Sequence, residues 1–294
     1  MKQKYSAAAV GAGCFWGLMG FFRRSLDVMG ISAVGVISVR CVFALLFFLV
    51  LVFFKDRNAF KIKLGDLWVF AGAGLMSILF FGWCYFKAMD HMSLSTAAIL
   101  LYTSPCFVIV FSAILFKEKL TAQKLIAMII AFAGCCLVSG AGGGDKLTFV
   151  GLALGLGSGI CYALYSVFSR VAINRGYSSF TMNIYSFAFA GIGALLLEKG
   201  ASVPIVFSSG SNLFFAVATG LVTGFMPYLL FTYALTGLEN GKTSIMASIE
   251  PVIATVLGAI VYKEKLSLLG ACGIILVLTA IVILNVNFRK KSTL

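Results

Sequence analysis

The sequence predicts an all-α membrane protein, in which ten transmembrane helices form two inverted five-helix repeats. Its composition excludes a soluble domain, because 61% of the residues are hydrophobic, 11% are charged and the mean hydropathy is +1.04. Soluble domains average about 45–50% apolar and about 25% charged residues. The apolar residues also occur in ten runs, and a membrane-spanning helix needs about 20 such residues. Finally, the second half of the chain repeats the first without a gap.

The first copy contains five apolar runs that polar segments separate. The first run follows Lys2 and Lys4 and resembles a signal peptide, but a partner in the second copy predicts a retained helix. The charged segment from Lys55 to Asp66 divides the second run from the third. The five predicted helices are 5–22, 31–54, 66–89, 94–116 and 122–140.

The second copy lies 146 residues further along the chain, as the spacing from Pro105 to Pro251 defines. Each proline is followed at the same distance by the same four-residue sequence, Lys117-Glu118-Lys119-Leu120 in the first copy and Lys263-Glu264-Lys265-Leu266 in the second. The corresponding helices are 149–171, 180–198, 212–236, 243–262 and 267–288. We therefore predict one repeat over 1–141, a linker over 142–148 and a second repeat over 149–294.

An odd number of spans makes the two copies enter the membrane from opposite faces. Such inverted repeats are typical of secondary transporters, with the substrate near the midplane. The positive-inside rule places both termini in the cytoplasm, because fifteen of the 23 Lys and Arg residues then lie inside. The inside set is Lys2, Lys4, Lys55, Arg57, Lys61, Lys63, Lys117, Lys119, Lys124, Arg170, Arg175, Lys242, Arg289, Lys290 and Lys291.

This charge bias accounts for the net charge of +13, so the sequence requires no nucleic-acid partner. The eight cysteines all lie in predicted spans, with no Cys-x-x-Cys pair and no metal-ligand spacing, which predicts buried, inert thiols. The single histidine, His91, lies in a connection. We therefore expect no metal, no cofactor and no enzyme activity.

The chain resembles the EamA-type transporters of the drug/metabolite transporter superfamily, over residues 5–140 and 150–288. The matching features are Trp16-Gly17, Arg40, Tyr85 to Ala88, Glu250-Pro251 and Lys263 to Leu266. The Glu-Pro pattern occurs once, because Ser104 stands in the first copy where the second has Glu250. The resemblance implies a secondary carrier of small metabolites in a cell membrane, such as a bacterial inner membrane. It also implies a central cavity built mainly by the first, third, fourth, sixth, eighth and ninth helices.

Glu250 is the main candidate for a substrate-binding and proton-coupling residue. It lies seven or eight residues into a predicted span, near the hydrocarbon centre, where a charge costs about 2.5–3.5 kcal/mol on insertion scales. Such a carboxylate can carry a proton or face a substrate ammonium. The alternatives are a structural ion pair with Arg40, or a hydrogen bond that caps the helix break at Pro251.

Arg40 is the corresponding candidate for binding a substrate carboxylate, since arginine stays charged and pairs with carboxylates through two hydrogen bonds. Its structural alternative is a contact with a helix C-terminus or with Glu250. Pro105 and Pro251 predict helix breaks that release the carbonyls of Leu101 and Ala247. Matched breaks in two halves point to a transporter site, although they also fit a passive kink.

Aromatic residues at helical spacing complete the candidate substrate site. Trp16 and Tyr162 correspond in the two copies and are predicted to form symmetric walls of a cavity, with packing as the alternative. Phe80, Trp83 and Lys87 share a face of the third helix, and Tyr102, Tyr228 and Tyr233 are weaker candidates. Glu118 and Glu264, each between two lysines, are expected to make local pairs at a span end.

From these residues we predict a monomeric secondary active transporter of small organic solutes, such as amino acids or amines. We expect it to be an exporter or exchanger that works by alternating access, with Glu250 as the candidate proton-coupling residue. The alternative is a nucleotide-sugar or sugar-phosphate exchanger. That function needs several cations in the cavity, and the sequence offers Arg40 and Lys87.

Overall fold

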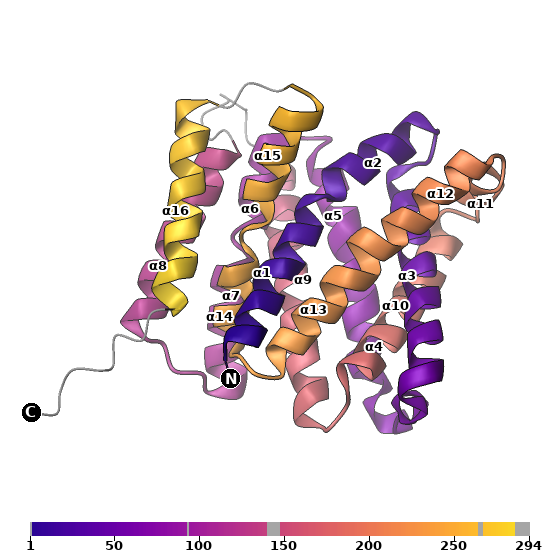
Figure 1. Cartoon of the computed structure of the whole chain (residues 1–294), viewed down its shortest axis with the longest axis horizontal. Coiled ribbons are helices and arrows are strands. Elements are labelled where there is room, and N and C mark those ends of the chain that lie inside the picture. Colours follow the sequence, from indigo (N-terminus) through magenta and orange to yellow (C-terminus); the bar gives the residue numbers. More distant parts are fainter. Residues whose placement is uncertain (1, 93, 140–147, 264–266, 286–294) are drawn as a thin grey trace, which may run out of the picture.

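The computed structural model describes residues 2–92, 94–139, 148–263 and 267–285, in which every regular element is helical (Figure 1). The predicted linker up to residue 147, the segment from Glu264 to Leu266 and the tail from residue 286 onwards lie outside the described residues. Nine described segments are long and apolar enough to cross a membrane, and Ala122–Val138 is a shorter apolar helix. The predicted all-α membrane fold is therefore confirmed.

Several spans consist of more than one helical segment. The first repeat contains α1 (Gln3–Gly17), α2 (Met19–Val28), α3 (Ala33–Lys55), η1 (Arg57–Phe60), η2 (Leu64–Asp66), α4 (Leu67–Ala71), η3 (Gly72–Phe80), α5 (Phe81–Ala88), α6 (Leu94–Leu101), α7 (Ser104–Phe116) and α8 (Ala122–Val138). The second contains α9 (Phe149–Asn174), α10 (Ser179–Leu197), α11 (Ser202–Val206), α12 (Gly210–Thr219), η4 (Gly220–Phe225), α13 (Met226–Leu235), α14 (Asn240–Ala247), α15 (Glu250–Val261) and α16 (Leu268–Asn285).

The helices pair as a two-fold relation between the repeats requires. The second span of each copy packs on its own counterpart (α3 on α10), and so does the fifth (α8 on α16). The first span of one copy packs on the third span of the other, in α1 with α13 and in α9 with α5. The interface between the repeats therefore runs through the middle of the bundle.

The fourth span of each repeat is broken near its middle. The helix ends at Leu101 and resumes at Ser104 in the first copy, and it ends at Ala247 and resumes at Glu250 in the second. Pro105 and Pro251 lie in the first turn of the resumed helix, where a backbone N–H has no helical partner to lose. Each break therefore sets a helix N-terminus at membrane depth.

Glycine lets the neighbouring helix approach each break closely. A Cβ placed on Gly13 of α1 would lie 2.4 Å from the carbonyl oxygen of Ala247. In the other repeat, a Cβ on the corresponding Gly159 would lie 2.9 Å from the oxygen of Leu100 and 3.4 Å from that of Leu101. Small residues permit such close helix contact in membranes, so these glycines fix how α1 and α9 seat against the breaks.

We expect Gly13→Ala to destabilise the protein by about 1–3 kcal/mol, the usual range for overpacking a tight site. The added methyl group would collide with the Ala247 oxygen and with Cγ2 of Ile249 at 2.5 Å. Gly20→Ala is the matched control, because no atom lies within 4 Å of a Cβ at that position. Thermal unfolding in detergent would compare the two variants, and equal melting temperatures would contradict the close packing.

Wide π-helical turns interrupt the third span of each repeat, which sequence periodicity did not predict. They are η3 and η4, at corresponding positions in the two copies. A Cβ on Gly74 would lie 2.8 Å from Cβ of Phe189, and one on Gly220 would lie 2.3 Å from Cβ of Phe43. Because Phe43 and Phe189 also correspond in the repeat, the same packing occurs twice. Such turns are frequent at functional sites.

Candidate functional site

Glu250 begins α15 directly after the helix break in the second repeat. Its side chain is half-buried, and its Oε2 accepts a hydrogen bond of 3.3 Å from the hydroxyl of Tyr162. The positive end of the helix dipole favours a negative charge at this position. The sequence therefore sets a partly accessible carboxylate within the bundle, where the resumed helix offsets some of the cost of its charge.

Aromatic rings from both repeats form one wall beside Glu250. The indole of Trp16 in α1 contacts the ring of Tyr162 edge-on, with centroids 5.8 Å apart, and that of Tyr228 in α13 at 5.3 Å. Phe231 lies 5.3 Å from the same indole. Trp16 is buried in this cluster, whereas the Tyr162 ring is only partly covered. Tyr162 therefore offers a partly exposed aromatic ring, and its hydroxyl donates a hydrogen bond to the Glu250 carboxylate.

Two further tyrosines lie within electrostatic range of the Glu250 charge. They are Tyr85 in α5 and Tyr102 at the break between α6 and α7. Together with Trp16, Tyr162 and Tyr228, they bring side chains from the first, third, fourth, sixth and eighth spans around a carboxylate of the ninth. These are the six spans that the family resemblance implied.

Arg40 in α3 is buried, with 5% of its surface exposed, and it makes little contact with acceptors. One guanidinium nitrogen lies 4.0 Å from the sulfur of Met19, and Nε has no hydrogen-bond partner. Its charge acts on Glu250 at a distance, but no ion pair joins these two described residues. Neither structural alternative for Arg40, a helix C-terminus or Glu250, is observed. A buried cation in this state can accept an anionic ligand.

Three predicted site residues lie outside the cluster around Glu250. Trp83 is 38% exposed and stacks on the exposed Phe80, on the face of the third span that points out of the bundle. Lys87 continues that face and forms an exposed ion pair with Asp90 at 2.9 Å. Tyr233 packs on Tyr5 at the end of the first span. Trp83 and Lys87 share one face of the third span, and that face is exposed on the outside of the bundle.

A buried polar network beside the aromatic wall was not predicted. The hydroxyl of Tyr165 donates to Oδ1 of Asn183 at 2.7 Å, and Nδ2 of Asn183 donates to Oγ1 of Thr232 at 2.9 Å. All three side chains are buried, and Tyr165 contacts Tyr228 at 4.8 Å. Asn183 within an apolar run was the available signal. The repeat did not reveal it, because Ile37 stands at the corresponding position of the first copy.

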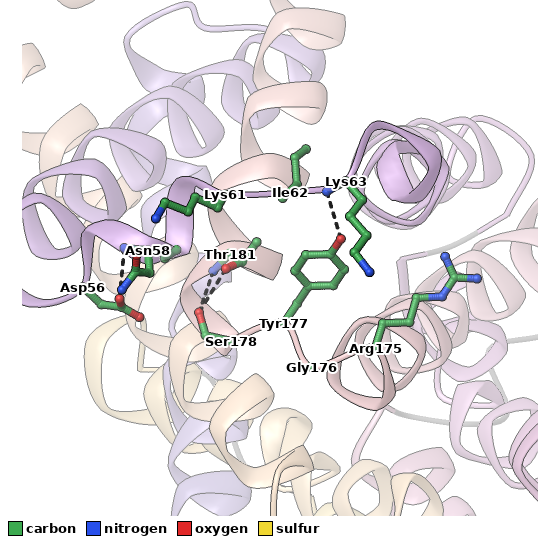
Figure 2. Close-up of a pocket in the computed structure, with 11 residues that line it drawn as sticks. Asp56, Asn58, Lys61, Ile62, Lys63, Arg175, Gly176, Tyr177, Ser178 and Thr181 are labelled. Atoms are coloured by element: carbon green, nitrogen blue, oxygen red, sulfur yellow. Dashed lines mark hydrogen bonds between the residues drawn. The ribbon is translucent and has the colours of Figure 1, made fainter.

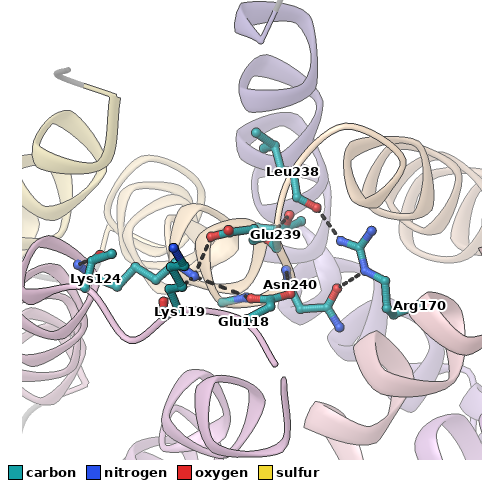
Figure 3. A network of polar contacts seen from close by, with 10 residues as sticks. Glu118, Lys119, Lys124, Arg170, Leu238, Glu239 and Asn240 are labelled. Carbon is teal, nitrogen blue, oxygen red and sulfur yellow. Dashed lines mark hydrogen bonds and ion pairs between the residues drawn. The ribbon is translucent and has the colours of Figure 1, made fainter. Parts of the chain in front are cut away.

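A second network closes the end of the bundle where the N-terminus lies (Figures 1 and 3). Glu118 accepts hydrogen bonds from the backbone N–H of Asn240 at 2.8 Å and of Gly241 at 3.5 Å, which caps α14. Lys124 pairs with Glu118 at 3.5 Å and with Glu239. Glu118 therefore makes a local pair with Lys124, as expected, and also bonds across to the second repeat, which was not predicted.

Arg170 of α9 extends this network from the second repeat. It donates to Oδ1 of Asn240 at 2.7 Å and to the carbonyl of Leu238 (Figure 3). Asn240 in turn donates to the carbonyl of Ser166 at 3.0 Å. Charged side chains of both repeats and the start of α14 are thus joined at one end of the bundle.

We expect Glu118→Gln to speed amide hydrogen exchange at the start of α14 by about tenfold, since hydrogen bonds to charged groups contribute about 1.5–3 kcal/mol. The substitution removes the charge that caps Asn240 and pairs with Lys124. Asp90→Asn is the control, because it removes an exposed ion pair, and such pairs contribute about 0.2–1 kcal/mol. Unchanged exchange in Glu118→Gln would mean that the network does not hold this end closed.

Two inverted helical repeats, broken helices that meet at mid-bundle and a carboxylate beside aromatic side chains together define a multi-pass membrane transporter. A model of the EamA-like transporter family matches residues 3–140 and 149–286, once in each repeat. The chain belongs to this family. It is a transporter and not an enzyme. Among the described residues, no group of three or more His, Cys, Asp or Glu side chains is arranged to hold a metal ion.

Curated relatives are similar over most of the chain. One from Clostridium kluyveri is 28% identical over 81% of this chain and 78% of its own length, and one from Archaeoglobus fulgidus is 26% identical over 92% and 94%. Both are described as uncharacterized transporters. A crystal structure of a protein with 17% identity superposes with a TM-score of 0.80 over 97% of both chains. The family and fold are therefore shown, whereas the relatives' names carry no substrate.

Proposed function

We propose that the protein is a secondary active transporter of small organic solutes with an amine group, such as amino acids or amines. Substrate binds near the bilayer midplane at Glu250, and the two repeats rock around it in alternating access. A proton exchanges on the Glu250 carboxyl and drives export or exchange. The observation that carries this proposal is a half-buried carboxylate at a broken helix, whose hydrogen-bond partner is the neutral hydroxyl of Tyr162.

The chemistry around Glu250 favours a cationic group of the substrate. A carboxylate attracts an ammonium, and the faces of tyrosine and tryptophan rings attract cations as well. Tyr85, Tyr102 and Tyr162 supply such rings together with hydroxyl groups. Arg40 supplies the opposite charge, and its buried guanidinium suits a substrate carboxylate. A zwitterion would use both groups.

The nucleotide-sugar or sugar-phosphate exchanger has less support. Such substrates carry several negative charges and need several cations. Lys87, the second cation expected for that function, lies exposed in an ion pair with Asp90. The site then offers Arg40 against the negative Glu250, which suits a solute of low net charge.

The remaining features follow from the same proposal. The closed network of Glu118, Lys124 and Arg170 lies at the end bearing the N-terminus, which the positive-inside rule makes cytoplasmic. The conformation is therefore one closed toward the cytoplasm. We place the protein in a bacterial plasma membrane as a monomer, because the two repeats already form a complete two-fold unit.

Thermal unfolding of the purified protein with candidate solutes tests this function. The panel contains amino acids, amines, sugars and nucleotide sugars, each measured at pH 6 and pH 8. A ligand present at about 100 times its dissociation constant adds about 2.7 kcal/mol of stability. We expect zwitterions or amines to raise the melting temperature, and the effect to disappear in Glu250→Gln. A response to nucleotide sugars alone would replace the proposal with the exchanger.

A further inference from the structure

A cavity of about 400 Å³ lies away from the Glu250 cluster, at the end of the bundle that bears the N-terminus. It opens between the connection from α3 to α4 in the first repeat and the connection from α9 to α10 in the second (Figure 2). Cationic side chains from both connections line it: Lys61, Lys63 and Arg175. Such a basic cavity at a membrane surface is a candidate for an anionic ligand.

Hydrogen bonds join the two connections that line the cavity. The hydroxyl of Tyr177 accepts from the backbone N–H of Lys63 at 3.1 Å and donates to Oδ2 of Asp66 at 2.6 Å. Arg175 pairs with Asp66 and lies over the ring of Trp68 at 5.1 Å. The hydrogen bond to Asp66 raises the pKa of Tyr177, so this hydroxyl stays protonated and keeps both bonds. Both repeats therefore build the cavity, and these contacts join its two sides.

The positive charges around the cavity exceed the negative charges available to balance them. Asp66 is already bonded to Arg175 and Tyr177, and Asp56 accepts from the backbone N–H of Asn58 at 3.1 Å. Lys63 interacts electrostatically with Asp66, but among the described residues neither Lys61 nor Lys63 forms an ion pair. Both lysine side chains are exposed at the cavity. With Arg175 balanced by Asp66, the two lysines outnumber the remaining carboxylate, Asp56, by one positive charge, which an added anion would balance.

The surroundings of the cavity favour an anion that has an apolar tail. Leu64 directly follows Lys63 and is 86% exposed, Phe60 is exposed on the same connection, and Trp68 is exposed at the start of α4. Tryptophan is enriched at the membrane–water interface, and Leu64 would point an apolar side chain toward lipid. A headgroup in the cavity would thus have acyl chains against exposed apolar side chains.

The repeat shows that the fold itself does not require these cations. The serine that caps α10, Ser178, has a counterpart in Ser32, which caps α3 in the same way. At the opposite end of the protein, however, the counterparts of Lys61, Lys63 and Arg175 are Phe207, Ser209 and Met29. A positive-inside bias accounts for basic residues on one face, but not for their convergence on one cavity from both repeats.

We propose that this cavity binds the phosphate of an anionic phospholipid headgroup, and that the lipid bridges the two repeats. Lys61 and Lys63 bind the phosphate oxygens, and Arg175 closes the far side. A free phosphate would share this chemistry, so the experiment must distinguish the two sources. The proposal is independent of the substrate at Glu250.

The test is thermal unfolding of the full chain in detergent, with phosphatidylglycerol titrated against a background of phosphatidylcholine. We expect a saturable rise in melting temperature for the wild type. In the double variant Lys61→Gln/Lys63→Gln, we expect the half-saturating lipid concentration to rise about 30-fold, since each lysine near an anionic surface contributes about 1 kcal/mol. Lys117→Gln/Lys119→Gln is the matched control, because it removes two exposed lysines near the same end outside the cavity.

Inorganic phosphate is titrated in parallel on the same variants. If phosphate alone gives the full rise, and the cavity variant loses it, the site is confirmed with a soluble ligand as its source. The proposal is overturned if phosphatidylglycerol stabilises both double variants equally, or if neither ligand has an effect. Melting temperatures in phosphatidylcholine alone show whether each variant folds like the wild type.

Discussion

Glu250→Gln is expected to weaken binding of an amine substrate by about 10- to 150-fold, since hydrogen bonds to a charged group contribute about 1.5–3 kcal/mol. The variant keeps the size of the side chain and an acceptor for Tyr162, but it removes the negative charge that faces the ammonium. It also resembles the protonated carboxyl at every pH. A proton gradient should therefore drive uptake or efflux by the wild type in proteoliposomes and leave the variant unaffected.

Two further variants separate the role of the charge from that of the fold. Tyr162→Phe removes the hydroxyl that bonds Glu250 and keeps the ring against Trp16, so we expect a loss of only a few-fold, about one neutral hydrogen bond. Asp90→Asn changes an exposed acid and should transport normally. If Glu250→Gln transports at the wild-type rate with the same response to pH, Glu250 has a structural role and the proton-coupling proposal fails.

Most of the fold was predictable because the membrane imposes strong constraints on the sequence. Apolar runs of sufficient length define spans, and a repeat read without a gap gives the number of spans and their two-fold relation. The wide turns η3 and η4 were missed because a π-helical turn leaves composition unchanged and only shifts which residues share a face. The break at Leu18, which separates α1 from α2, was also not predicted, because no proline marks it in the sequence.

The site was predictable where a charged side chain in a membrane span carries a high free-energy cost. It was less predictable where residues only share a helical face. A carboxylate or guanidinium within an apolar run is expected to face the interior of the protein rather than lipid, and Glu250 and Arg40 both lie inside the bundle. Trp83 and Lys87 were chosen by spacing alone, and spacing does not distinguish a face toward a cavity from one toward lipid. The Glu118 network was missed because it depends on contacts between segments about 120 residues apart.

Arg40→Met is expected to raise thermal stability while it abolishes tight binding of carboxylate substrates. An unpaired charge is costly to bury, so replacing it by an apolar side chain of similar volume should stabilise the protein, and Arg40 has no carboxylate partner to leave behind. A substrate carboxylate bound by the guanidinium would lose a charge-assisted interaction, which corresponds to about 10- to 150-fold in affinity. Thermal unfolding without and with a zwitterionic substrate measures both effects.

The combination of the two effects is what distinguishes a binding residue from a structural one. If Arg40 instead holds the fold together, Arg40→Met should lower stability by about 3–5 kcal/mol, as for a buried charge pair that loses one member, and ligand binding should fall only with folding. Simple amines provide an internal control, since they lack a carboxylate and should bind Arg40→Met and the wild type alike. A buried cation that weakens the apo protein and strengthens its complex would be a group retained for its ligand, because no ion pair to Arg40 is found among the described residues and its Nε has no hydrogen-bond partner.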